Sequence, residues 1–273
     1  MHKKIFSILI YLFAIIGFLL TGGYFAVRFG FTNTNGIIDT QRESFLANSI
    51  STHKTKNITP IWAETEECLV FKEAVRKDKD VIIKAANKAD IDPRIIVANL
   101  AVEQLRLFFS TREIYKTVFA PLKILGTQSQ FSWGVMGIKP ETAEKIEYHL
   151  ITNTSPFYPG PNYEHLLDFK TKEHGAERFA RLTDQRDRYY SYLYASLYIK
   201  EILTQWSKAG FDISHKPEII ATLYNIGFER SLPKNNPLMG GAQIDIGTET
   251  YSFGSLAADF YNSSELIDIF PKK

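Results

Sequence analysis

An uncharged apolar segment near the N-terminus constrains the fold of this chain most. From Ile5 through Val27 there is no charged residue, and about 20 such residues suffice for a helix to cross the hydrocarbon core of a bilayer. Lys3 and Lys4 precede the segment and Arg28 follows it. Because positive charge on a short N-terminal side favours keeping that end in the cytoplasm, we expect the remainder of the chain on the extracytoplasmic side.

The same segment also fits a cleavable signal peptide. Its strongly apolar part ends near Leu20, and the small residues Thr21, Gly22 and Gly23 follow, which is the composition of a processing site. A single-pass anchor and a secreted protein therefore both stay open. The lone cysteine, Cys68, lies far from this segment, so we expect neither a lipid attachment there nor an internal disulfide.

Composition changes divide the chain into three parts. Residues 1–28 form the membrane anchor or signal peptide, and residues 29–64 read as a linker rich in Asn, Thr and Ser. Residues 65–273 contain apolar helical patterns at short spacing, which predict one mainly α-helical domain with a C-terminal extension. The whole chain has 32 basic and 30 acidic residues, and their scattering gives no basic stripe for nucleic-acid binding.

Helix start and stop signals locate the elements of this domain. Pro140 and Pro217 suit first helical positions, and Gly210 suits the residue just past a helix end. A loop is expected over 153–162, and irregular chain from 228 onward, which either packs as an extension or covers one end of a cleft. The predicted helices cover 65–77, 81–89, 93–103, 140–148, 184–208, 217–225 and 255–261, with 184–208 the longest.

The most informative helix follows Asp92-Pro93. Asp92 can cap its first turn, and Pro93 lacks only an N–H that would have no partner there. Helical spacing places Glu103 on a mainly apolar stripe with Ile96, Asn99, Leu100 and Leu107. Desolvation there favours the protonated carboxyl, which makes Glu103 a candidate general acid. The alternative is a structural ion pair with Arg106, one turn further along.

Two later motifs accompany the Glu103 helix: Ser132 to Ala143 (SWGVMGIKPETA) and Ala221 to Gly227 (ATLYNIG). The three segments together, over roughly residues 78–230, resemble the lytic transglycosylase and goose-type lysozyme superfamily. In that family a helix delivers the catalytic Glu. A turn of the form Gly-Leu-Met-Gln-Ile-Met-Pro-x-Thr-Ala then lines the cleft, and a helix ending Ala-Tyr-Asn-x-Gly closes it.

The chain departs from the family pattern at three places. Gln104 stands where the family has Ser directly after the catalytic Glu, and Gly137 aligns with the usual Gln of the turn. Residues 104–131 form a longer, aromatic-rich insertion between the Glu103 helix and the turn. These departures indicate a divergent branch of the family.

The resemblance implies a lysozyme-like helical domain that cleaves peptidoglycan without a cofactor. Glu103 would act as the single acid and base, protonating the oxygen between N-acetylmuramic acid and N-acetylglucosamine and then taking a proton from the sugar 6-hydroxyl. The product would carry a 1,6-anhydro ring. Tyr224 and Asn225 would orient Glu103 or the sugar, Ser132 would bind the N-acetyl group, and the turn backbone would line the cleft. The implied substrate-binding residues are Ser132, Val135, Met136, Gly137, Ile138, Tyr224 and Asn225.

Two other functions stay open. A non-catalytic protein that binds glycan strands and scaffolds an envelope complex is suggested by Gln104 and Gly137. A hydrolytic muramidase would need a second carboxylate, for which Asp168, Asp184 and Asp187 are candidates. The six histidines show no metal-ligand spacing and no Gly-rich phosphate loop follows a strand pattern, so we expect no metal site. The expected location is the bacterial inner membrane, with the domain in the periplasm.

Overall fold

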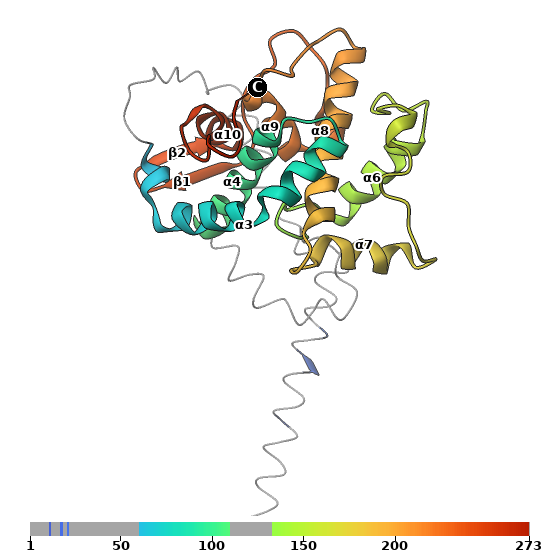
Figure 1. The fold of residues 1–273 in the computed structure, drawn as a ribbon, viewed down its shortest axis with the longest axis horizontal. Coiled ribbons are helices and arrows are strands. Elements are labelled where there is room, and N and C mark those ends of the chain that lie inside the picture. Colours follow the sequence, from blue (N-terminus) through green and yellow to red (C-terminus); the bar gives the residue numbers. More distant parts are fainter. Residues whose placement is uncertain (1–10, 12–16, 19–20, 22–59, 110–132, 273) are drawn as a thin grey trace, which may run out of the picture.

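The computed structural model describes residues 60–109 and 133–272, together with isolated positions between Tyr11 and Thr21. The described part is mainly α-helical, as predicted (Figure 1). Its elements are η1 (Ile61–Glu64), α3 (Glu66–Lys88), α4 (Pro93–Phe109), α6 (Pro140–Ile151), η4 (Pro161–Tyr163), α7 (His174–Thr183), α8 (Tyr189–Lys208), α9 (Pro217–Ile226), η5 (Phe228–Arg230), β1 (Gln243–Ile246), β2 (Glu249–Ser252) and α10 (Phe253–Asn262).

Helix α4 is the core of the domain, in contact with α3, α8, α9, α10 and β1. Residues 94–103 are all buried, so this helix is enclosed on every side. Asp92 accepts the N–H of Arg94 at 2.9 Å, which confirms the predicted start of the helix. The helix continues past its predicted end at Glu103 to Phe109, as the helical spacing used for Arg106 and Leu107 requires, because no Gly or Pro interrupts it.

Helix α3 is one continuous element where two helices, 65–77 and 81–89, were predicted. Thr65 caps its first turn by accepting the N–H of Cys68 at 3.2 Å. Residues 78–80 were predicted to lie between the two helices. Instead they continue the helix, and the Asp78 carboxylate accepts hydrogen bonds from Arg188 at 2.9 Å and from the Tyr192 hydroxyl at 2.6 Å, both on or next to α8.

The predicted helix 184–208 begins five residues late, at Tyr189. The Asp184 carboxylate accepts the N–H groups of Arg186 and Asp187 at 2.8 and 3.1 Å. An Asp side chain that binds nearby backbone in this way competes with helix formation. With 20 residues, α8 is shorter than α3, which has 23, so the prediction of the longest helix was also wrong.

Helix α7 and both strands were not predicted. Helix α7 precedes α8, and a short antiparallel hairpin, β1 and β2, interrupts the region expected to be irregular. In β1, Ile244 and Ile246 are buried while the alternate residues are exposed, which is the period of a strand with one face on the core. Four residues are too few for this alternation to stand out in a sequence.

The C-terminal extension packs into the domain through Arg94. This fully buried guanidinium donates to the backbone carbonyls of residues that end α10 and follow it, at 2.7 to 3.1 Å. The five acceptors are the carbonyl oxygens of Phe260, Tyr261, Ser263, Glu265 and Phe270. Helix α10 itself contacts both α9 and α4, so the extension completes the core.

Within the described residues, no helix is long and apolar enough to cross a membrane. The predicted anchor, residues 5–27, falls almost entirely outside that part, as do most of the linker and residues 110–132 of the insertion. The anchor, the signal peptide and the extracytoplasmic location therefore stay predictions.

Candidate active site around Glu103

Glu103 is buried in the middle of the domain, with 4% of its surface exposed. Its Oε2 lies 2.5 Å from Nη2 of Arg106, one turn further along α4. Glu103 is thus buried, as expected for a proton donor. It also forms the ion pair with Arg106 that was considered as the alternative. Burial opposes ionisation of the carboxyl, whereas the guanidinium favours it.

The turn at residues 133–138 faces this carboxylate. Trp133 and Ile138 pair across it, the N–H of each donating to the carbonyl of the other at 2.6 and 3.2 Å. Gly137 has φ +64°, and a Cβ placed on it would lie 2.7 Å from Glu103 Oε2. A side chain at this position would collide with the carboxylate, so Gly137 allows the turn backbone to lie directly against Glu103.

Two side chains hold the turn in place. Gln104 Nε2 donates to the carbonyl of Val135 at 2.8 Å, and the Tyr224 hydroxyl donates to the carbonyl of Met136 at 2.7 Å. These donors come from α4 and α9, so the turn is bound from two helices. Burial, followed by the nearby Glu103 charge, raises the pKa of Tyr224 well above its ordinary value, which keeps the hydroxyl protonated and able to donate.

The back of the turn rests on α7 and on the start of α8. A Cβ on Gly134, which has φ +65°, would lie 2.2 Å from the carbonyl oxygen of Leu182 and 2.7 Å from Ser191 Oγ. The Trp133 ring meets the Phe179 ring edge to face, with centroids 5.0 Å apart. Because the turn touches α7 this closely, the position of α7 determines the position of the turn.

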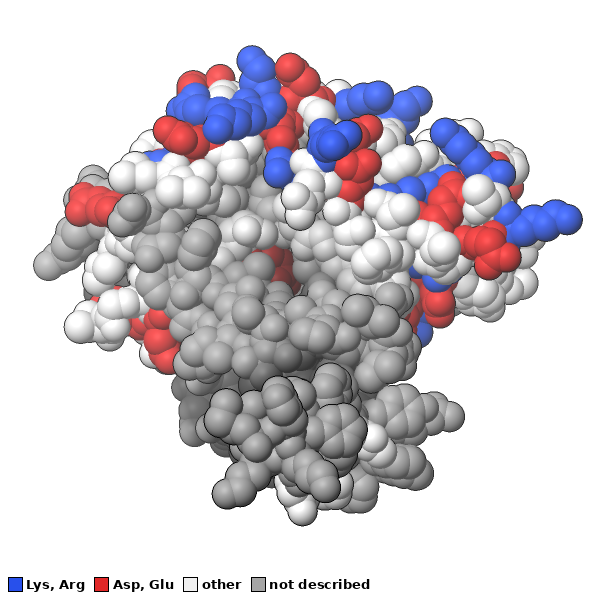
Figure 2. All heavy atoms as spheres, turned by 90° about the horizontal axis from the view of Figure 1, so that it is seen from below, with Lys and Arg blue, Asp and Glu red and all other residues white. Residues whose placement is uncertain are grey.

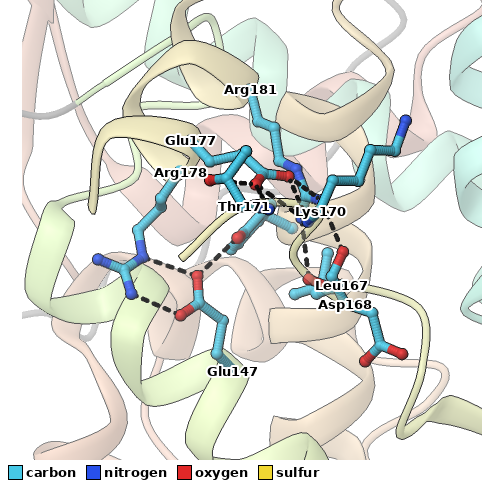
Figure 3. A network of polar contacts seen from close by, with 9 residues as sticks. Glu147, Leu167, Asp168, Lys170, Thr171, Glu177, Arg178 and Arg181 are labelled. Carbon is cyan, nitrogen blue, oxygen red and sulfur yellow. Dashed lines mark hydrogen bonds and ion pairs between the residues drawn. The ribbon is translucent and has the colours of Figure 1, made fainter. Parts of the chain in front are cut away.

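A network of ion pairs fixes α7 against α6 (Figure 3). Arg178 donates to both carboxylate oxygens of Glu147 at 2.7 and 2.6 Å, and to Glu144 at 2.8 Å. The Tyr194 hydroxyl of α8 also donates to Glu147, at 2.6 Å. Two-point pairing of this kind fixes orientation as well as distance, so these contacts join α6, α7 and α8 behind the turn.

Arg181 fixes the loop before α7 in the same region (Figure 3). It donates to the carbonyls of Leu167 and Asp168 at 2.8 and 2.6 Å and pairs with Glu177 at 2.5 Å. Glu177 in turn accepts the N–H groups of Lys170 and Thr171. These contacts satisfy the buried Arg181, and they give this network a structural role.

The substrate-binding residues inferred from the motifs are only partly brought together. Met136 and Ile138 are buried and Val135 is half-buried, so the turn can face a ligand mainly through its backbone. Ser132 lies outside the described residues. Tyr224 contacts the site through the turn, because its hydroxyl donates a hydrogen bond to the Met136 carbonyl.

Asn225 faces the C-terminal extension through its amide oxygen. This oxygen accepts the N–H of Ala242 at 2.9 Å, and a Cβ on Gly241 would lie 3.0 Å from it. Gly227, at φ +97°, ends α9 as predicted, with its N–H on the Leu223 carbonyl. The amide at the end of α9 therefore binds the loop before β1, which the motif alone did not indicate.

The three aspartates considered as a second carboxylate flank α7. At the surface, Asp168 Oδ2 lies 3.0 Å from His165 Nδ1. Asp184 accepts from the two backbone N–H groups described above, which lower its pKa, and Asp187 accepts the N–H of Tyr189 at 3.0 Å. Each carboxylate has a local structural role. Among the described residues no group of His, Cys, Asp and Glu could hold a metal ion.

The surface seen from below has a hollow with acidic atoms at its floor (Figure 2). Among the described residues on this face, the Lys and Arg side chains lie among Asp and Glu side chains, and no area of one sign stands out (Figure 2). A surface of mixed charge can bind a ligand through its shape and its hydrogen bonds more than through net charge.

Sequence reasoning missed the contact of Gln104 with the turn and a second buried carboxylate, Glu201. Gln104 was noted only as a departure from the family, and its reach across to Val135 depends on the turn's position. Glu201 is fully buried on α8, whereas a Glu is ordinarily exposed, so its residue type gave no reason to single it out.

Comparison of the chain with protein-family models, with curated proteins and with solved structures found no match in any of the three.

Proposed function

We propose that this protein is a lytic transglycosylase that cleaves the β-1,4 bond between N-acetylmuramic acid and N-acetylglucosamine in peptidoglycan. The observation that carries the proposal is Glu103, a buried carboxylate lying against a turn that Gln104 and Tyr224 hold by its carbonyls. The family resemblance of the three motifs that build this arrangement supports it. A lysozyme-like fold for the helical domain is part of the same proposal.

One carboxylate is enough for this reaction. Protonated Glu103 gives its proton to the glycosidic oxygen as the bond from that oxygen to the sugar C1 breaks. The sugar's own 6-hydroxyl oxygen then bonds to C1 and returns its proton to Glu103, which closes the 1,6-anhydro ring and restores the acid. No water is consumed, so no second carboxylate is needed to activate it.

End-group analysis tests the proposal against its alternatives. The full chain in detergent is incubated with purified peptidoglycan, and the products are identified by mass spectrometry. Anhydro ends support the transglycosylase, reducing ends would replace it with a muramidase, and intact glycan with retained binding would replace it with a scaffold. Glu103→Gln should lower the rate by about two orders of magnitude or more, whereas Asp168→Asn and Asp187→Asn should leave it nearly unchanged.

The proposed substrate requires an extracytoplasmic domain, held at the inner membrane by residues 5–27 or secreted after their removal. In a bacterium, protease added to the periplasmic side should reach the domain, and N-terminal sequencing distinguishes the two forms. A mature protein that starts between Gly22 and Ala26 would rule out the anchor and leave the reaction unaffected.

A further inference from the structure

We propose that Arg106 is a positioning residue that holds Glu103 in its ionised form and must release Oε2 before Glu103 can deliver a proton. This inference deepens the proposed function and takes its mechanistic meaning from it. It concerns a residue outside the three motifs that carry the family resemblance.

The first observation is the ion pair itself. Arg106 Nη2 lies 2.5 Å from Glu103 Oε2, and the two side chains are 18% and 5% exposed. An ion pair with so little solvent around it is screened weakly, so the guanidinium acts on the carboxylate at nearly full strength. Since both residues lie on α4, the pair forms without any contribution from the rest of the site.

The second observation is the turn backbone beside the same carboxylate oxygen. A Cβ on Gly137 would lie 2.7 Å from Oε2 and 2.9 Å from the carboxyl carbon. Oε2 therefore has both the turn backbone and the guanidinium close to it. Because Gln104 and Tyr224 hold the turn, Arg106 is the partner that can move, and 18% exposure of its side chain gives it a path toward solvent.

The neighbouring ionisable groups leave this assignment intact. Tyr224 faces Glu103 from α9, and its hydroxyl stays protonated. Behind it on α8 lie Tyr198, whose ring centroid is 5.0 Å from that of Tyr224, and the buried Glu201. The turn at 133–138 has no ionisable side chain. Among these neighbours Arg106 supplies the positive charge.

The chemical consequence is a preliminary proton step. With Arg106 in place Oε2 is a carboxylate oxygen, which is the form that accepts the proton of the 6-hydroxyl at the end of the reaction. For the first step the guanidinium withdraws from Oε2 and a proton from water binds there. That proton then moves to the glycosidic oxygen, and the carboxylate takes up the proton of the 6-hydroxyl as described above. Release of this last proton to water, as Arg106 pairs with Oε2 again, restores the starting state.

Proton titration of Glu103 tests the inference without substrate. In the full chain in detergent, labelled with ¹³C at the glutamate carboxyl, the Glu103 signal is assigned by its loss in Glu103→Gln. Its midpoint should move to higher pH in Arg106→Met and Arg106→Gln, by about one pH unit or more, a tenfold change in proton affinity. Arg106→Lys should show a smaller shift. Arg76→Met is the matched control, since Arg76 pairs with Asp268 at 2.9 Å on the exposed side of α3.

Activity then tests the release step. The high-pH limb of the kcat/KM profile should move upward in the Arg106 variants by the same amount as the titration midpoint. An unchanged midpoint in both neutral variants would overturn the inference, and so would a shifted midpoint with a stationary limb. A shifted midpoint in a chain whose wild type forms no anhydro ends would keep the role of the ion pair and refute the proposed function instead.

Discussion

Glu201 should make the protein lose stability as the pH rises. It is fully buried on α8, and neither carboxyl oxygen has a hydrogen-bond partner among the described residues. The nearby Tyr198 hydroxyl is also buried without a partner. Burial raises the pKa of Glu201 well above 4.5, so the carboxyl is neutral in the folded protein at pH values where an unfolded chain would ionise it.

The sign and size of the effect follow from proton linkage. A folded-state pKa above the unfolded value means that the stabilising contribution is fully present below the unfolded pKa. It is lost as pH rises toward the folded pKa. In that window the folded protein holds one more proton, so its free energy of unfolding falls by about 1.4 kcal/mol per pH unit. Glu201→Gln carries no proton in either state and should lack this slope.

Urea unfolding of the full chain in detergent, repeated from pH 4.5 to 8, measures the difference between variant and wild type. The free energy of unfolding of Glu201→Gln should increase steadily relative to wild type as the pH rises. Glu201→Met, which also removes the unpaired polar atoms, should show the same trend. Glu73→Gln, on the exposed side of α3, is the control and should show no trend. A difference between Glu201→Gln and wild type that stays constant over this range would mean that Glu201 is ionised or partnered in the folded protein.

Four other changes separate structural from catalytic roles. Arg94→Met removes the donor to five backbone carbonyls and should cost about 3 kcal/mol or more in urea unfolding. Gly137→Ala adds a Cβ against Glu103 at φ +64° and should lower the glycan cleavage rate at least about tenfold. Tyr224→Phe frees the Met136 carbonyl and should lower turnover. Asn225→Ala should instead lose about 1 kcal/mol of stability and keep its turnover per folded molecule, and equal turnover losses in these last two variants would refute the division.

The helix starts marked by proline were predicted correctly because their signals are local. Asp92-Pro93, Pro140 and Pro217 each begin a helix where proline's missing N–H and fixed φ suit the first position. Gly227 likewise ends α9 at positive φ. These residues determine their own backbone conformation, so tertiary contacts have little effect on where these helices begin or end.

The errors have both distant and local causes. Asp78 lies within α3 and its carboxylate binds Arg188 and Tyr192, on or next to α8, partners that no local pattern contains. The hairpin of β1 and β2 has two strands of four residues, each too short to show a clear period. The late start of α8 has a local cause, the Asp184 carboxylate on nearby backbone.

The site divides in the same way. Burial of Glu103 follows from helical spacing, and pairing with Arg106 follows from their separation along the same helix. The sequence offered these as alternatives, and both are present. The contacts that cross between elements were not predicted. Gln104 reaches the turn, and Asn225 reaches the loop before β1, and each depends on where another segment lies.

The departures from the family pattern at Gln104 and Gly137 have one geometric explanation. Gly137 removes a side chain from the turn exactly where the carboxylate lies, and Gln104 supplies from α4 a polar group that binds the same turn. The Val135 and Met136 carbonyls are thereby occupied within the protein, by Gln104 and Tyr224. In the proposed function the turn would contribute to the glycan site chiefly as a fixed wall beside Glu103, held by donors from α4 and α9. Loss of the Gln104 or Tyr224 donor should therefore change the position of the turn, with a smaller effect on the position of the Glu103 carboxyl.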